Sequence, residues 1–164
     1  MTGDQSRLIE LAKAITNFTE QISKCYHAAG LSEPSLSLSS SGVLETPEYD
    51  KLRSSLNDAV NELMYLVTGP KKSLRLFGAT HFDLAALQVA VEYDFFQAVP
   101  LDGLVTLKDL AQKTDLDENQ VASVMRLLAT QNMFVEPQTG VFGHTSYSAL
   151  MARDSDIKDC AHMQ

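Results

Sequence analysis

Histidine and cysteine are the side chains that most often do acid–base, nucleophilic or metal-binding chemistry near neutral pH. The chain has four histidines and two cysteines: His27, His81, His144, His162, Cys25 and Cys160. Cys25 and His27 resemble half of a zinc site, but no second pair of ligands follows them. His81 opens an apolar segment and His144 closes a hairpin, so we expect both to be surface or capping residues rather than catalytic bases. No metal site is predicted.

Paired carboxylates are the other arrangement that could do acid–base chemistry. We interpret the pairs Asp115/Asp117 and Asp154/Asp156 as solvated caps of helices. The patterns G-x-G-x-x-G, G-x-x-x-x-G-K-[ST], H-E-x-x-H and G-x-S-x-G do not occur in the sequence. The residues alone therefore predict no catalytic and no cofactor-binding group, and they leave open whether the chain is an enzyme.

The composition is that of a folded protein whose second half is acidic. Hydrophobic residues make up 45% of the 164 residues, which is enough for one modest domain with an extension. Residues 81–164 hold 12 acids and 5 bases, against a net charge of −8 for the whole chain. Because neither a long apolar run nor a secretory signal occurs, we predict a cytoplasmic chain with no membrane span and with reduced thiols.

The first 46 residues predict a helix and a linker. Residues 4–29 form a helix with one apolar face, made of Leu8, Leu11, Ile15, Phe18, Ile22, Cys25 and Ala29. This helix could lie on the rest of the domain or contact a partner subunit, and the pattern leaves both alternatives open. Residues 30–46 are rich in serine and predict a mobile linker, which Leu36 and Leu38 could attach to a surface.

Residues 47–164 are predicted to form one helical domain that contains a winged helix at residues 81–151. Thr46 and Pro47 suit an N-cap and a first helical residue, and predict a helix to about Val67. A short helix over residues 71–77 is predicted to end at Gly78. Residues 80–99 are apolar on most faces, which predicts one buried helix.

Residues 106–150 have the order helix, helix, hairpin, helix. Thr106 and Asp117 suit the caps of two helices, with an inward face made of Leu107, Leu110, Ala111, Val121, Val124, Met125 and Leu128. Strands at 134–136 and 141–143 flank a Pro-Gln-Thr-Gly turn, and Thr145 suits the cap of a last helix. The predicted fold class is mainly α: a winged helix-turn-helix with a small β-hairpin wing, preceded by long N-terminal helices.

Charge argues against the DNA binding for which many winged helices are used. The second helix of such a unit enters the major groove, and here it begins with Asp115, Asp117 and Glu118. Arg126 is the only base on that helix, and the hairpin carries none. Because a DNA footprint needs a basic patch, we predict a module that packs against protein and has no nucleic-acid partner.

Three stretches carry a family resemblance: LAALQVAVEYDFFQAVP, TLKDLAQKTDLDENQVASVMRLLATQNMFVEP and VFGHTSYSALM. Together they resemble the N-terminal dimerisation domain of class I S-adenosylmethionine-dependent O-methyltransferases, in the style of fungal natural-product enzymes. The resemblance implies an interlocked homodimer whose N-terminal helices cover a partner's substrate pocket. It also implies S-adenosylmethionine as the cofactor of a full-length relative or partner. The family's cofactor-binding Rossmann domain is absent from this sequence, so no cofactor or catalytic residue is carried over.

His162 is the one pocket candidate that the resemblance adds, because some family members, including pericyclases, place a substrate-pocket residue nearby. The favoured hypothesis is a dimerisation and substrate-lid module of an O-methyltransferase-like biosynthetic enzyme, which needs a Rossmann-domain chain for catalysis. The alternatives are a stand-alone truncated homologue acting as an interaction or regulatory subunit, and a cofactor-independent, pericyclase-like cyclase in a dimer pocket. All imply a homo-oligomer or a methyltransferase-like partner chain, with a small-molecule substrate as a further possibility.

Overall fold

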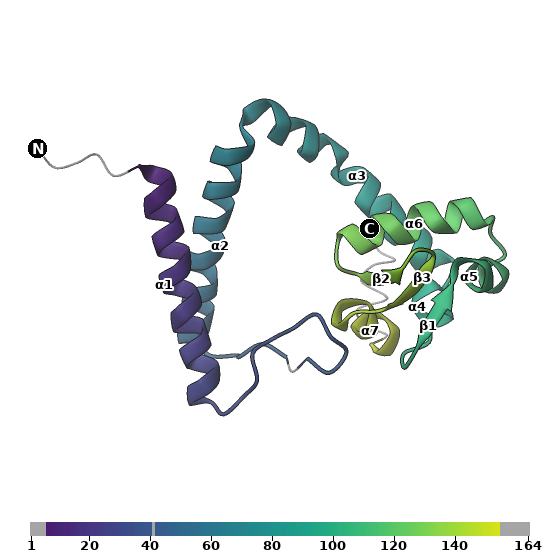
Figure 1. The fold of residues 1–164 in the computed structure, drawn as a ribbon, viewed down its shortest axis with the longest axis horizontal. Coiled ribbons are helices and arrows are strands. Elements are labelled where there is room, and N and C mark those ends of the chain that lie inside the picture. The colour runs from purple at the N-terminus through teal and green to yellow at the C-terminus, as the bar shows by residue number, and fades with distance from the viewer. Residues whose placement is uncertain (1–5, 41, 155–164) are drawn as a thin grey trace, which may run out of the picture. The chain divides into compact units, whose positions relative to one another are not determined.

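The computed structural model describes residues 6–40 and 42–154. The described part contains seven helices and one three-stranded sheet (Figure 1). The described residues divide into two compact units, one of residues 6–34 and 42–78 and the other of residues 35–40 and 79–154. Each unit has its own buried side chains, so the two are described separately.

The first unit is built around two antiparallel helices, α1 (Arg7–Ala28) and α2 (Pro47–Thr68), which lie side by side (Figure 1). Arg7 begins α1 and its guanidinium donates to the Glu62 carboxylate near the end of α2, at 2.7 and 2.6 Å. At the other end the hydroxyls of Tyr26 and Tyr49 are 3.5 Å apart, with their rings edge to face. Of the two alternatives for the first helix, packing within its own unit is therefore observed.

The predicted apolar face of the first helix is partly wrong. Leu11 is buried as expected, but Leu8 is 43% exposed. Tyr26 is fully buried although it was not on the predicted face. Burial, followed by the hydrogen bond with Tyr26, raises the pKa of the Tyr49 hydroxyl to about 12. The Tyr49 hydroxyl therefore stays protonated, and its contact with Tyr26 closes this end of the helix pair.

The cap of α2 forms as predicted, and the serine-rich segment is attached to the second unit. The Thr46 hydroxyl accepts a hydrogen bond from the Tyr49 N–H at 3.2 Å, with Pro47 at the first helical position. The Leu36 carbonyl accepts from the Ser146 N–H at 3.0 Å. That N–H opens a helix and has no partner within it, so the contact satisfies a donor that helix formation leaves over.

Helix α3 (Pro70–Glu92) corrects two predictions. It runs without a break through Gly78, whose φ is not positive, so the predicted helix end at that glycine is wrong. It ends instead before Asp94, whose left-handed φ of 53° separates it from the short helix α4 (Phe95–Ala98). The predicted buried helix over residues 80–99 is therefore two helices. Within α3 only Ala86, Ala90 and Val91 are buried.

The second unit is a winged helix built on a three-stranded sheet. Its elements after α4 are β1 (Leu104–Thr106), α5 (Leu107–Thr114), α6 (Glu118–Thr130), β2 (Phe134–Gln138), β3 (Val141–His144) and α7 (Ser146–Arg153). The antiparallel strand order is β1-β3-β2, with Leu104 opposite Gly143 and Phe134 opposite His144. Strand β1 was not predicted, so the expected two-stranded wing is one side of a larger sheet.

The core of this unit lies between the sheet and helices α3 to α7. Its fully or nearly fully buried members include Phe95, Phe96, Leu110, Val121, Met125, Leu128, Phe134 and Phe142. The Phe96 and Phe134 rings stack with centroids 5.4 Å apart. Most of the predicted inward face of α5 and α6 is in this cluster, and the predicted mainly helical fold class with a winged helix is confirmed.

Candidate dimer interface

Helix α3 exposes large apolar side chains along its first half. Leu74 and Phe77 are 72% and 79% exposed, the highest values among large hydrophobic residues of the described chain. They are three residues apart and so lie on one face of the helix. Further along the same helix, Phe82 and Leu84 are also exposed. No residue from Pro70 to Ala85 is buried in the described structure.

The last turns of α2 are exposed in the same way. Four consecutive residues, Met64 to Val67, are all exposed, and Val67 reaches 71%. Consecutive helical residues are about 100° apart around the axis, so these four exposed residues cover most of the circumference of the helix. Its first turns differ, because Tyr49 is buried against α1.

These two surfaces are chemically suited to contact with protein. Covering a Val, Leu or Phe side chain stabilises by about 1.5–3 kcal/mol. Scattered exposed apolar residues need no explanation, but several large ones on neighbouring turns mark an interaction surface. We name the exposed apolar residues of α2 the α2 surface (Val60, Met64, Tyr65, Leu66, Val67) and those of the first half of α3 the α3 surface (Leu74, Leu76, Phe77).

His144 contradicts the prediction of a surface or capping histidine. It is only 5% exposed, at the end of β3. Its Nε2 lies 3.1 Å from the Val99 carbonyl oxygen and its Nδ1 lies 2.8 Å from the Ser148 hydroxyl. A carbonyl oxygen can only accept, so Nε2 carries the proton and Ser148 donates to Nδ1. Burial lowers the pKa of His144, which keeps the ring neutral.

The same network caps helix α7. The Ser148 hydroxyl accepts from the Thr145 N–H at 3.1 Å, and the Thr145 hydroxyl accepts from the Tyr147 N–H at 3.2 Å. This is a reciprocal capping box, so Thr145 caps the helix as predicted. Because Ser148 is fully buried, the His144–Ser148 pair joins elements of the core.

The other candidate residues do not gather at one place. His27 is exposed, with its ring 4.0 Å from the Glu33 carboxylate, and His81 is exposed on α3. Asp117 caps α6 by accepting from the Asn119 N–H, as expected of a solvated cap. His162, Cys160 and Asp156 lie outside the described residues. The described residues contain no cluster of three metal-ligating side chains and no helix able to cross a membrane.

The residues that would contact DNA are acids or, in the case of Arg126, a base that already pairs with an acid. Asp115 and Asp117 stand at the two sides of the turn before α6. Arg126 lies 3.5 Å from the Glu136 carboxylate on the neighbouring strand, so an acid already partners its charge. The absence of a nucleic-acid partner stays a prediction, with this pairing in its favour.

Comparison with known proteins adds the family. Residues 76–154 match the model of the O-methyltransferase dimerisation domain. Over 161 residues the chain is 37% identical to O-methyltransferase sol2 of Alternaria solani, covering 98% of this chain and 38% of that protein. It is 30% identical to the chlorophenol O-methyltransferase of Trichoderma longibrachiatum, covering 94% and 33%. A further relative is the agnestins biosynthesis cluster transcriptional coactivator AgnL9 of Paecilomyces divaricatus, at 30% identity, covering 93% and 34%.

Solved structures show the same fold. The crystal structure of OxaC in complex with SAH and oxaline matches with a TM-score of 0.71 at 18% identity, covering 96% of this chain and 36% of that one. The match includes the helix pair as well as the winged helix, because it covers nearly the whole chain. The chain spans little more than a third of the length of these relatives. Residues 76–154 therefore match the O-methyltransferase dimerisation domain, within a chain that is similar over nearly all its length to part of fungal O-methyltransferases.

Proposed function

We propose that this chain is the dimerisation and substrate-lid module of an O-methyltransferase-like biosynthetic enzyme. The α2 and α3 surfaces pair with a second methyltransferase-like chain, in the first instance another copy. The observation that carries the proposal is the exposure of Leu74 and Phe77 on helix α3. In the described chain, the first four turns of this helix contain no buried residue. The family match over residues 76–154, which begins within this helix, supports it.

S-adenosylmethionine is the cofactor we propose for the full-length relative or partner. Support comes from the bound SAH of the OxaC structure, to which this chain is similar in fold. The residues described here do not fit the cofactor, because their sheet is antiparallel and their positive-φ glycines lie at helix ends and in a hairpin. A dinucleotide-type loop would instead join a parallel strand to a helix. Calorimetric binding of S-adenosylmethionine to this chain alone at micromolar strength would contradict the assignment.

Light scattering after size exclusion tests the pairing. We expect the natural sequence to elute as a dimer or larger, and the double variant Leu74→Asp with Phe77→Asp to elute as a monomer, because a buried unpaired carboxylate opposes association. Tyr147→Asp is the matched control, since Tyr147 is 55% exposed on α7 and lies in neither surface. A monomeric natural sequence, or a double variant that stays dimeric, contradicts the proposal.

The similarity to a transcriptional coactivator favours a second candidate, an interaction or regulatory subunit without its own chemistry. The mass of the natural polypeptide separates the two candidates. Immunoblotting of the native source should detect either a protein near the 18.0 kDa of this chain or a much longer one. A short protein that co-purifies with a full-length methyltransferase supports the regulatory subunit. A long one supports the enzyme module, and the cytoplasmic location stays a prediction in both cases.

A further inference from the structure

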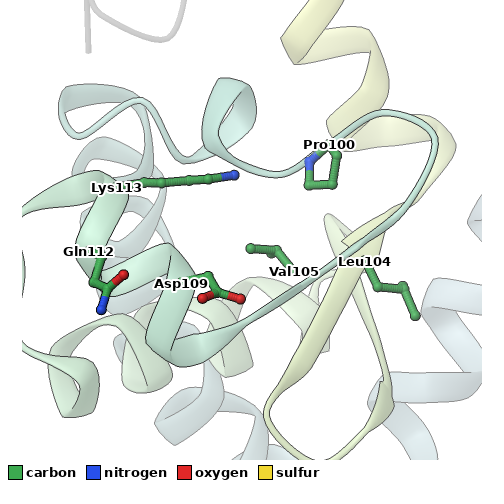
Figure 2. Close-up of a pocket in the computed structure, with 6 residues that line it drawn as sticks. All are labelled: Pro100, Leu104, Val105, Asp109, Gln112 and Lys113. Carbon is green, nitrogen blue, oxygen red and sulfur yellow. The ribbon is translucent and has the colours of Figure 1, made fainter.

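A groove of about 380 Å³ lies in the winged helix, away from the α2 and α3 surfaces in sequence. It is enclosed by strand β1, helix α5 and the segment that follows α4 (Figure 2). Its lining residues are Pro100, Leu104, Val105, Asp109, Gln112 and Lys113. The volume is in the range of small-molecule sites, and the groove is far too small to be a protein–protein interface by itself.

Two opposite charges face this groove without pairing with each other. Asp109 and Lys113 are four residues apart on α5, a spacing at which an acid and a base on a helix ordinarily pair. Here the Thr106 hydroxyl donates to the Asp109 carboxylate at 2.8 Å, and the Lys113 ammonium donates to the Ala98 carbonyl at 2.8 Å. Figure 2 shows Lys113 extending toward the chain at Pro100 while Asp109 points toward Val105. The two charges are therefore held at separate places of one groove.

Both charged groups keep capacity for a ligand. An ammonium has three N–H donors, and the Ala98 carbonyl takes one of those of Lys113. A carboxylate can accept about four hydrogen bonds, and the Thr106 hydroxyl supplies one to Asp109. The rest of the lining is Gln112 and the aliphatic residues Pro100, half-exposed Leu104 and buried Val105. The lining thus offers one cation, one anion and an aliphatic surface.

We propose that this groove binds a small zwitterion with an aliphatic side chain, of the class of a free α-amino acid. Lys113 receives the carboxylate and Asp109 receives the ammonium group. The aliphatic side chain lies against Pro100 and Leu104. No bond is made or broken, so the site is one of recognition.

An NMR titration of the ¹⁵N-labelled chain tests the proposal with three probes of equal side chain. L-Leucine carries both charges, N-acetyl-L-leucine only the negative one, and L-leucinamide only the positive one. We expect L-leucine to shift the amide signals of residues 104–113 saturably, and the two blocked forms to bind about fivefold more weakly or worse. Absence of shifts with L-leucine, or equal binding of a blocked form, overturns the proposal.

Variants separate this site from the proposed pairing surface. Asp109→Asn and Lys113→Gln should each weaken L-leucine binding by about fivefold. In Asp109→Asn the side-chain oxygen still accepts the hydrogen bond from the Thr106 hydroxyl. This variant therefore keeps the fold even if Lys113→Gln does not. Lys108→Gln, an exposed neighbour outside the groove, should bind as the natural sequence does. The double variant of Leu74 and Phe77 should bind L-leucine unchanged even as a monomer. Unweakened binding in both groove variants contradicts the site.

Discussion

At the residue scale, His144 connects two parts of the fold that lie far apart in the sequence. Its ring joins the end of α4 to the cap of α7, through Val99 on one side and Ser148 on the other. From the sequence, His144 was predicted to be a surface or capping residue because it closes the hairpin. The partner that buries it, Val99, lies 45 residues earlier in the chain, and no local pattern reports such a contact. Within the local sequence, only Ser148, four residues later, could have indicated a partner for the ring.

We predict that the neutral state of His144 makes the fold sensitive to mild acid. Its pKa is lowered in the folded chain, so below the ordinary value of about 6.5 the unfolded chain binds a proton that the folded chain does not. The free energy of unfolding should therefore fall as pH drops from about 7 toward 5.5. Urea unfolding midpoints measured across that range check this prediction.

Two variants identify the residue responsible for the pH dependence. His144→Gln removes the titrating group, and its midpoint should change less between pH 7 and 5.5 than that of the natural sequence. His27→Gln is the control, because His27 is exposed and packs in no core. A His144→Gln profile as steep as that of the natural sequence would assign the acid sensitivity to other groups.

Leu128 gives a second prediction at the residue scale. It was predicted to face inward, and it is 2% exposed in the core of the winged unit. Leu128→Ala should lower the free energy of unfolding by about 2–5 kcal/mol, since it removes buried methyl groups and leaves a cavity. Leu150→Ala, at a leucine that is 50% exposed, should change it by about 0.5 kcal/mol or less. Chemical denaturation of the two variants side by side decides the matter.

At the scale of the elements, the helix starts were the most predictable features. Thr46, Thr106, Asp117 and Thr145 each cap a helix as expected. Capping is decided within three or four residues, so the sequence contains all the necessary information. Asp115 and Asn132, which adopt left-handed φ values of 55° and 58°, end their helices by equally local means.

Strand β1 could not be predicted in the same way. Leu104 to Thr106 is three residues long and is a strand only because β3 lies beside it. Its partner residues lie about 35 to 39 positions later in the chain, from the pair Thr106 and Val141 to the pair Leu104 and Gly143. The charge-bearing groove depends on the same long-range pairing, so the local sequence around Asp109 and Lys113 does not indicate it. Short strands and the sites beside them require tertiary structure.

At the scale of the elements, Gly78 gives a prediction about the stability of helix α3. The glycine lies inside α3 without a positive φ, and a Cβ placed on it would meet nothing within 4 Å. Gly78→Ala should therefore stabilise the chain by about 0.5–1 kcal/mol, because glycine is a poor residue for a helix interior. Gly140→Ala should do the reverse, since Gly140 needs its φ of +76° to close the β2–β3 hairpin. Thermal melts followed by circular dichroism compare the two, and a destabilised Gly78→Ala would mean that the helix is broken there.

At the scale of the whole molecule, the distribution of apolar surface is the dominant feature. The winged helix buries its own core, while α2 and α3 leave Val67, Leu74 and Phe77 more than two-thirds exposed. Covering these exposed side chains lowers the free energy of the chain. The match to a dimerisation domain indicates that association with another chain is how they are covered. Association and stability should then be coupled.

We therefore predict that the melting temperature depends on protein concentration. If the paired state is the one that unfolds, mass action stabilises it as concentration rises, by roughly 2–4 °C for each tenfold increase. The double variant Leu74→Asp with Phe77→Asp should melt at a temperature that does not change with concentration, since it has no pairing equilibrium to shift. Differential scanning calorimetry over a hundredfold range distinguishes these outcomes. A flat response from the natural sequence would mean that the exposed helices are stable without a partner, and that their apolar side chains serve something other than pairing.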